Sequence, residues 1–173
     1  VVLDYACGTG IITNHIAASV SEVHAIDMSS KMIEVAQREA RERGIDNVHY
    51  AQSAIFDGSY AEGSFDVILA FNVLHLLEDA QRVVRRTNEL LKPGGLFISA
   101  TPCLGERKSL LGGLFFLLSR TGITPKIEFP RFSELEGLIA GGNLQIVETR
   151  DLHQTPPNYF MVAQKIERMV PPG

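Results

Sequence analysis

The stretch that decides the fold of this chain is Val1-Val2-Leu3-Asp4-Tyr5-Ala6-Cys7-Gly8-Thr9-Gly10. Its apolar, β-prone first half ends in an acid, and two glycines then precede a segment whose apolar residues have helical spacing. A strand that leads into a helix through Gly-x-Gly builds a ligand site at its carboxyl end, because glycine lets a ligand approach the backbone closely. The stretch therefore predicts a binding site, and other residues must indicate the ligand.

Composition limits the classes of function. The chain has 173 residues, of which 45% are hydrophobic, and a net charge of −4. This fits one domain with a sizeable core. The negative charge argues against a nucleic-acid partner, whose binding surface would carry a basic stripe. We accordingly expect Arg82, Arg85 and Arg86 to form a solvated helix face.

Two further features concern the cellular location. Cys7 and Cys103 lie far apart and belong to no Cys/His cluster, so we expect neither a disulfide framework nor a metal site, and we expect a cytoplasmic location. The sequence shows no signal peptide and no apolar stretch long enough for stable membrane insertion. Because the chain begins inside an apolar strand and without methionine, we expect residues to be missing upstream.

Strand and helix patterns alternate through the first part of the chain. Strict alternation predicts a parallel sheet with right-handed crossovers. Ser29 or Ser30 is expected to cap the second helix, and Lys92-Pro93-Gly94-Gly95 to end the third, because proline cannot continue a helix. The expected strands span 1–5, 22–27, 48–51, 65–71 and 96–100, and the expected helices span 11–20, 30–43 and 77–91.

The alternation stops after the fifth strand. Residues 102–129 are interpreted as an insertion or lid-like segment, whose apolar run 110–118 could serve core packing, a lid, a dimer contact or a membrane-surface element. A helix is predicted at 132–140, and strands at 144–152 and 158–166. Their link is too short for a parallel crossover, so we expect these two strands to pair antiparallel at one edge. No second-domain boundary is visible, and 1–173 is interpreted as a single domain.

The acid Asp27 narrows the choice of ligand. It ends the second strand about twenty residues after the glycine turn, where a carboxylate suits a ribose. Charged hydrogen bonds to such a carboxylate contribute roughly 1.5–3 kcal/mol each. Dinucleotides and nucleoside-type cofactors such as S-adenosylmethionine share this geometry.

Asp4 and Thr13 separate these two ligand classes. The dinucleotide fingerprint has a third glycine where this chain has Thr13. The carboxylate of Asp4 would repel a pyrophosphate, whereas it would attract the α-ammonium group of a methionine moiety. The charges therefore favour S-adenosylmethionine, and an NAD(P)-dependent oxidoreductase is the disfavoured alternative.

Five motifs occur together in a fixed order. They are the opening stretch, Ala25-Ile26-Asp27-Met28-Ser29, Ser64-Phe65-Asp66-Val67-Ile68, Asn72-Val73-Leu74-His75 and Leu91-Lys92-Pro93-Gly94-Gly95. In these motifs the chain resembles the class I S-adenosylmethionine-dependent methyltransferases of small-molecule type, over nearly its whole length. The resemblance implies a Rossmann-like, doubly wound α/β fold, with a mostly parallel seven-stranded sheet, an antiparallel last strand and helices on both faces.

The resemblance also assigns residues to the cofactor. Asp4 would reach the methionine end and Asp27 the ribose, while Met28 would pack on the adenine. Ser53 stands where many relatives carry an Asp that accepts from the adenine amino group, so a neutral hydroxyl or the backbone of Ala54 would have to serve instead. The full predicted set is Asp4, Ala6, Gly8, Gly10, Asp27, Met28, Ser53, Ala54 and Asn72.

The expected reaction is methyl transfer to a small, apolar molecule by in-line displacement. Because the sulfonium is already activated, positioning is the main task, and a base is needed only if the acceptor must lose a proton. His75 is the candidate base, with a packing or capping role as its alternative. The absence of prolines from the motif at 72–75 disfavours exocyclic nitrogens as acceptors. A non-catalytic S-adenosylmethionine-binding module is the second alternative, and the oligomeric state is left open.

Overall fold

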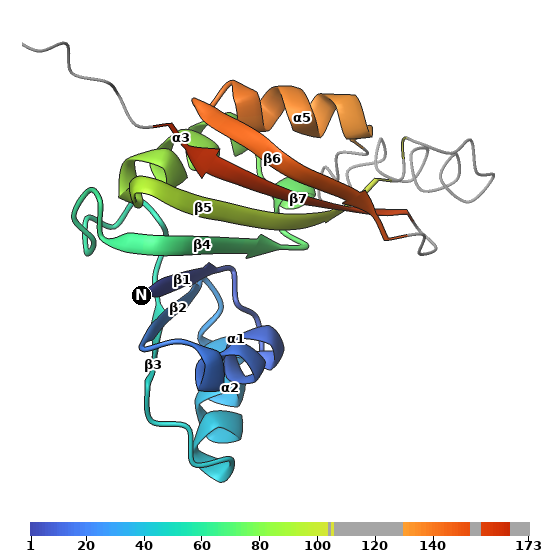
Figure 1. The fold of residues 1–173 in the computed structure, drawn as a ribbon. Coiled ribbons are helices and arrows are strands. Elements are labelled where there is room, and N and C mark those ends of the chain that lie inside the picture. Colours follow the sequence, from blue (N-terminus) through green and yellow to red (C-terminus); the bar gives the residue numbers. More distant parts are fainter. Residues whose placement is uncertain (104, 106–129, 153–156, 167–173) are drawn as a thin grey trace, which may run out of the picture.

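A computed structural model describes residues 1–103, 105, 130–152 and 157–166 of the chain. Within them lies one seven-stranded sheet with the order β3-β2-β1-β4-β5-β7-β6 (Figure 1). The strands are β1 (Val2–Tyr5), β2 (Val23–Asp27), β3 (Val48–Gln52), β4 (Phe65–Phe71), β5 (Leu91–Pro102), β6 (Leu144–Asp151) and β7 (Asn158–Lys165). The helices are α1 (Ile11–Ile16), α2 (Ser30–Glu42), α3 (Ala80–Leu90) and α5 (Phe132–Ala140), with 3-10 turns η1 (Ala17–Ser19) and η2 (Leu74–Leu76).

The strand directions confirm the predicted topology. Strands β1 to β5 pair parallel with their neighbours, and β7 is antiparallel to both β5 and β6. The expected antiparallel pair of β6 and β7 is therefore present. β7 is its inner strand and pairs with β5, and β6 forms the edge of the sheet. The hairpin is closed by the backbone N–H of Leu152, which donates to the carbonyl oxygen of Asn158 over 2.9 Å.

Helix ends differ from the predicted ones for local reasons. The helix expected over 77–91 begins at Ala80, because the side chain of Asp79 accepts from the backbone N–H of Arg82 and caps the helix there. Leu91 already pairs with Phe65 in the sheet. The Lys92-Pro93-Gly94-Gly95 segment is consequently an irregularity within β5, where the register jumps to Val67 opposite Leu96. The α-helix predicted over 11–20 ends at Ile16 and continues as η1, and Ser29 caps α2.

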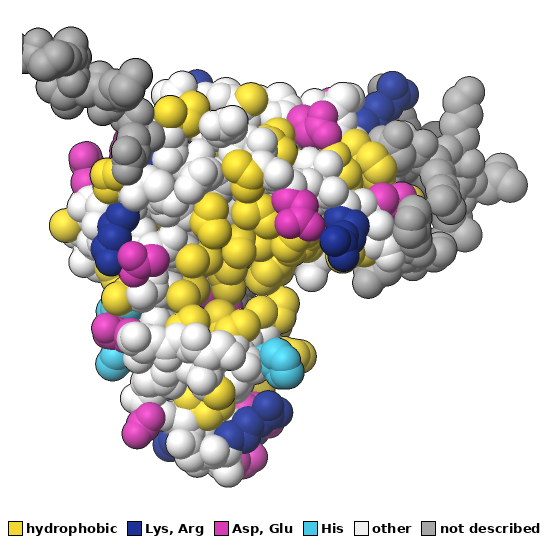
Figure 2. Space-filling view, viewed as in Figure 1, with side chains coloured by type: hydrophobic (Ala, Val, Ile, Leu, Met, Phe, Trp, Pro, Cys, Tyr) yellow, Lys and Arg dark blue, Asp and Glu magenta, His cyan; other side chains and the backbone are white. Residues whose placement is uncertain are grey.

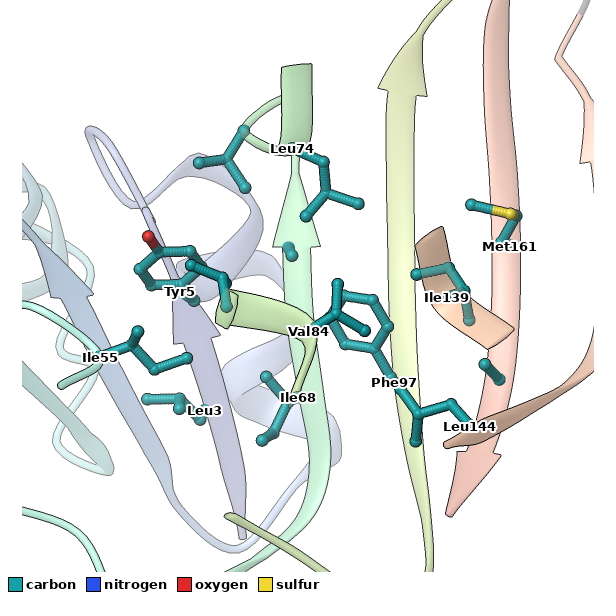
Figure 3. Packing of buried hydrophobic residues seen from close by; sticks show 14 of the residues in the cluster. Leu3, Tyr5, Ile55, Ile68, Leu74, Val84, Phe97, Ile139, Leu144 and Met161 are labelled. Atoms are coloured by element: carbon teal, nitrogen blue, oxygen red, sulfur yellow. The ribbon is translucent and has the colours of Figure 1, made fainter. Parts of the chain in front are cut away.

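The larger core lies between the sheet and the helices α3 and α5. Alternate side chains of the central strands point to this face, as expected for pleated strands. Burial of one such aliphatic or aromatic side chain stabilises a fold by roughly 1.5–3 kcal/mol. Figure 3 shows its centre, which includes the buried residues Leu3, Ile68, Val84, Phe97 and Ile139.

A smaller cluster occupies the opposite face, which carries α1 and α2. Val2, Val23, Ala25 and Leu69 are buried there, with Ile16 packed against them. Helices α1 and α2 lie near the β1–β3 end, and hydrophobic side chains gather over β4, β5 and β7 (Figures 1 and 2). The fold class predicted from the sequence, a doubly wound sheet with helices on both faces, is thus confirmed.

Two sequence predictions fall on residues that the structure does not describe. The apolar run 110–118 and most of the proline-rich link 153–157 lie outside the described residues. Among the residues that are described, no helix is long and apolar enough to cross a membrane.

Candidate functional site

The turn after β1 contains three residues with left-handed backbone conformation. Ala6, Gly8 and Gly10 have φ values of 59°, 56° and 75°. A non-glycine residue in this region is strained, and such strain gathers at functional sites. A Cβ on Gly10 would collide with the hydroxyl of Tyr50 and the Cβ of Ala36, whereas one on Gly8 would meet no heavy atom within 4 Å. Gly10 therefore serves helix packing, and the open space lies beside Gly8.

Asp27 joins this turn to the neighbouring strand. Its Oδ2 accepts from the backbone N–H of Gly8 over 3.0 Å, and its Oδ1 accepts from the N–H of Ser29 over 2.8 Å. A carboxylate has about four acceptor positions, so two remain for a ligand. The geometry is that of a fixed, half-exposed carboxylate beside the glycine turn, and it suits the two hydroxyls of a ribose.

Asp4 lies beneath the same turn. Its side chain is only 3% exposed, and its Oδ2 accepts from the hydroxyl of Thr13 over 2.5 Å. Burial raises the pKa of Asp4 to about 6; the Thr13 hydrogen bond partly opposes this rise, and the charge of Asp27 adds to it. Asp4 is therefore ionised at neutral pH, and this ionisation lowers the stability of the fold because the charge is buried. The negative charge of Asp4 can attract a cationic group of a ligand across the turn, although the carboxylate itself is buried.

Sequence reasoning missed two side chains that pack beneath the turn, Thr13 and Tyr50. Thr13 was considered only as the place where a glycine is missing, yet it is fully buried and holds the Asp4 carboxyl. Tyr50, on β3, donates from its hydroxyl to Oδ1 of Asn14 over 2.8 Å and packs under Gly10. Only the position of Thr13, nine residues after Asp4 at the start of a helix, could have suggested the first contact.

The carboxyl end of β3 adjoins Asp27. The backbone N–H of Ser53 donates to the carbonyl oxygen of Asp27 over 3.1 Å, and the side chain of Met28 beside it is 74% exposed. The hydroxyl of Ser53 and the N–H of Ala54 both donate to Oδ2 of Asp57, over 2.8 and 2.7 Å. Asp57 is not among the site residues predicted from the sequence.

Asn72 follows the carboxyl end of β4. It has a φ of 55°, and its backbone N–H donates to the carbonyl oxygen of Ala100 over 2.8 Å. Its side-chain oxygen accepts from Nδ2 of Asn158 over 3.4 Å, a contact with β7 that the sequence did not suggest. Asn72 and Ala6 are thus strained residues at the ends of two paired strands.

His75 lies in η2, just beyond Asn72. Its side chain is half-buried, and its Nδ1 is buried with no hydrogen-bond partner in the part of the chain that the structure describes. Burial lowers the pKa of the imidazole, so it is neutral at pH 7 and able to accept a proton. Cys7 is unsuited to nucleophilic chemistry, because burial raises the pKa of its thiol to about 12.

The arginines of α3 differ in part from the prediction. Arg82 and Arg85 are exposed, as expected. Arg86 is not part of a solvated face, because its side chain is only 17% exposed and its guanidinium donates to the carbonyl oxygens of Ile55 and Tyr60 over 3.4 and 3.0 Å. It thereby fixes the connection between β3 and β4 against α3.

The predicted cofactor residues therefore converge at one edge of the sheet. All of them lie at or just after the carboxyl ends of β1, β2, β3 and β4, which are neighbours in the sheet. In open α/β sheets, ligands bind at this edge. Among the described residues, no group of three or more His, Cys, Asp and Glu side chains could hold a metal ion. The predicted residues that the fold places at this edge are Asp4, Ala6, Gly8, Gly10, Asp27, Met28, Ser53, Ala54 and Asn72.

Comparison with known proteins agrees with this arrangement. A family model described as a methyltransferase domain matches residues 1–120. A ubiquinone biosynthesis O-methyltransferase of Serratia proteamaculans is 29% identical over 172 residues, which are 96% of this chain and 71% of that protein. Other curated relatives are also longer, and the chain spans as little as 24% of one of them, an uncharacterised protein of Synechococcus.

Solved structures show the same fold. An S-adenosylmethionine-dependent methyltransferase from Methanosarcina mazei superposes with a TM-score of 0.79 at 20% identity, covering 95% of this chain and 92% of that one. The (4+2) cyclase SpnF superposes with a TM-score of 0.80 at 16% identity, covering 95% and 74%. The chain belongs to the class I S-adenosylmethionine-dependent methyltransferase family. The resemblance seen in the five sequence motifs is thereby confirmed, and S-adenosylmethionine is the cofactor of this family.

Proposed function

We propose that this chain transfers the methyl group of S-adenosylmethionine to a small, apolar molecule. The observation that carries the proposal is the pair of acids at the glycine turn. Asp4 places a buried negative charge beneath the turn, where it suits an α-ammonium group and opposes a pyrophosphate. Asp27 presents its remaining acceptor positions beside the turn, where they suit ribose hydroxyls.

In this proposal, the residues of the chain bind and orient the cofactor. Asp27 would hold the ribose, Met28 would cover the base, and the backbone beside Gly8 would lie under the ligand. S-adenosylmethionine supplies an activated methyl group, so the protein contributes mainly by alignment. His75, neutral at pH 7, is available to take a proton from an acceptor hydroxyl. Asn72 would position the methionine moiety from the end of β4.

The relatives support the acceptor class. Several are ubiquinone biosynthesis O-methyltransferases, and their names favour an oxygen atom of a small molecule as the acceptor. A nucleic-acid partner is not proposed, since the chain carries net negative charge. The cytoplasmic location and the single domain over 1–173 stay predictions of the sequence.

A non-methylating function is the second candidate. SpnF, a cyclase, shares this fold, so the fold alone does not determine the reaction. In that case, the chain would bind S-adenosylmethionine and release it unchanged. The two candidates are separated by incubating the protein with S-adenosylmethionine and a panel of hydroxylated metabolites, and measuring S-adenosylhomocysteine production.

Calorimetry tests the cofactor site itself. We expect S-adenosylhomocysteine to bind more tightly than NAD. Asp27→Ala should weaken its binding by roughly 30- to 150-fold, because about 2–3 kcal/mol of charged hydrogen bonding is lost. Asp46→Asn, which removes an exposed acid from the loop before β3, is the matched control and should leave affinity unchanged. Tighter binding of NAD, or an unaffected Asp27 variant, would refute the proposal.

A further inference from the structure

Asn158 is the first residue of β7, and its backbone is held from both sides. Because β7 runs antiparallel to β5, this residue lies at the carboxyl edge of the parallel strands, opposite Pro102 (Figure 1). Its carbonyl oxygen accepts from the N–H of Leu152, at the end of β6, over 2.9 Å. The carbonyl oxygen of the preceding Pro157 accepts from the N–H of Cys103 over 2.7 Å. The Asn158 side chain is therefore mounted on a fixed backbone.

The side chain of Asn158 contacts a residue of the candidate site. Its Nδ2 donates to Oδ1 of Asn72 over 3.4 Å, across the end of β5. Its own Oδ1 is buried and has no hydrogen-bond partner in the part of the chain that the structure describes. A buried oxygen without a partner is costly, and it is seldom found in a side chain that serves only the fold. The contact with Asn72 thus indicates a role at the site.

Asn72 leaves the sheet next to the glycine turn. Strands β1 and β4 are paired, with Asp4 opposite Leu69, and both end a few residues later at the same edge. The backbone N–H of Asn72 donates to the carbonyl oxygen of Ala100 over 2.8 Å, which holds its main chain in place. The direction of its side-chain amide is then decided by what that amide contacts, and the contact on this side is Asn158.

The direction of this hydrogen bond determines which group of Asn72 is left for a ligand. An asparagine amide has one oxygen that accepts and one NH2 group that donates. Because Asn158 donates to the oxygen of Asn72, the NH2 group of Asn72 remains available. The α-ammonium group of an amino acid can only donate, and its α-carboxylate can only accept. The charge of Asp4 suits the ammonium group, so the NH2 group of Asn72 suits the carboxylate.

We propose that Asn158 is a positioning residue for the amino-acid end of S-adenosylmethionine. By donating to Asn72, it turns the NH2 group of Asn72 towards the α-carboxylate of the cofactor. This inference rests on the proposed function, since it requires the amino-acid end of the cofactor to lie at Asp4 and Asn72. It gives a part in binding to β7, a strand that carries none of the cofactor residues predicted from the sequence.

Calorimetry with two ligands tests the inference. Decarboxylated S-adenosylmethionine differs from S-adenosylmethionine only by the missing α-carboxylate, so the ratio of the two affinities measures recognition of that group. Asn158→Leu keeps a side chain of similar size and removes the donor. It should lower this ratio by about 10-fold, because the hydrogen bond to a charged group is no longer aligned. Affinity for the decarboxylated compound should change by less than about 3-fold.

A double-mutant cycle shows whether Asn158 acts through Asn72. In an Asn72→Ala background, Asn158→Leu should not change the ratio further. Gln164→Leu is the matched control, because Gln164 lies on the same strand and donates from Nε2 to the carbonyl oxygen of Gly94 over 2.9 Å, at the other end of β7. It should keep the wild-type ratio.

Thermal unfolding of Asn158→Leu checks that the variant is folded, and Asn158→Asp, which also lacks the NH2 donor, provides a second variant of the same shape. An unchanged ratio in folded Asn158→Leu, or a further fall of the ratio in the Asn72→Ala background, would overturn the role of Asn158 while leaving the proposed function standing. Failure of the wild-type protein to bind S-adenosylmethionine would overturn both.

Discussion

Replacing Asp4 by Asn separates two effects of the buried carboxyl, one on stability and one on cofactor binding. In the folded chain the pKa of Asp4 is about 6, compared with 3.8 for an ordinary Asp, because burial disfavours the charged form. The contribution of Asp4 to the stability of the fold is therefore fully present below pH 3.8, and it is lost as the pH rises through 6. The pKa difference corresponds to about 3 kcal/mol at neutral pH.

Asn cannot ionise, so Asp4→Asn does not carry this cost. Its carbonyl oxygen can still accept from the Thr13 hydroxyl. Burying the amide adds a contribution that does not vary with pH. The difference in unfolding free energy between variant and wild type should therefore grow in favour of the variant, by about 2.4 kcal/mol between pH 4 and pH 7.5.

Urea denaturation of ligand-free protein at several pH values measures this difference. Binding should change in the opposite direction. At pH 7.5 the variant lacks the charge that attracts the α-ammonium group, so its affinity for S-adenosylhomocysteine should fall below that of wild type. At pH 5 the two affinities should converge, because wild-type Asp4 is then mostly protonated. A stability difference that does not vary with pH, or one that shrinks as the pH rises, would show that Asp4 is not a buried carboxylate with a raised pKa.

Two further predictions concern the glycine turn and the imidazole. Gly10→Ala should destabilise the protein more than Gly8→Ala: both residues have left-handed φ, which costs roughly 1–2 kcal/mol for alanine, but only at Gly10 does the new Cβ also collide with Tyr50 and Ala36. Urea denaturation checks the order, and equal losses would contradict the packing role of Gly10. His75 should titrate below the ordinary 6.5 in an NMR pH series, because burial disfavours its cation, and stability should decline as the pH falls below 6.5. An imidazole that titrates at 6.5 or above would contradict its burial.

Local sequence patterns were sufficient for the elements and for the class of ligand. Strand β4 begins and ends as predicted because its near-continuous apolar run has no competing local structure. The glycine turn could be identified because Gly8, Gly10 and Asp27 act through backbone conformation and strand ends, which short spacings specify. The end of α3 was misjudged because Leu91 pairs with Phe65, 26 residues earlier in the chain, a contact that no local pattern reports.

Only the tertiary structure decided the electrostatics of the site. The sequence shows that position 4 carries a carboxyl group. Its raised pKa depends on how deeply packing buries it, and the hydrogen bond from Thr13 partly opposes the rise. Similarly, the connection after Ser53 is held by Arg86 on α3, which donates to the carbonyl oxygen of Ile55, 31 residues earlier in the chain. Chain spacing fixes which residues follow each strand. The charge, exposure and free acceptor atoms of those residues depend on contacts between distant segments, and these form only when the sheet and helices pack together.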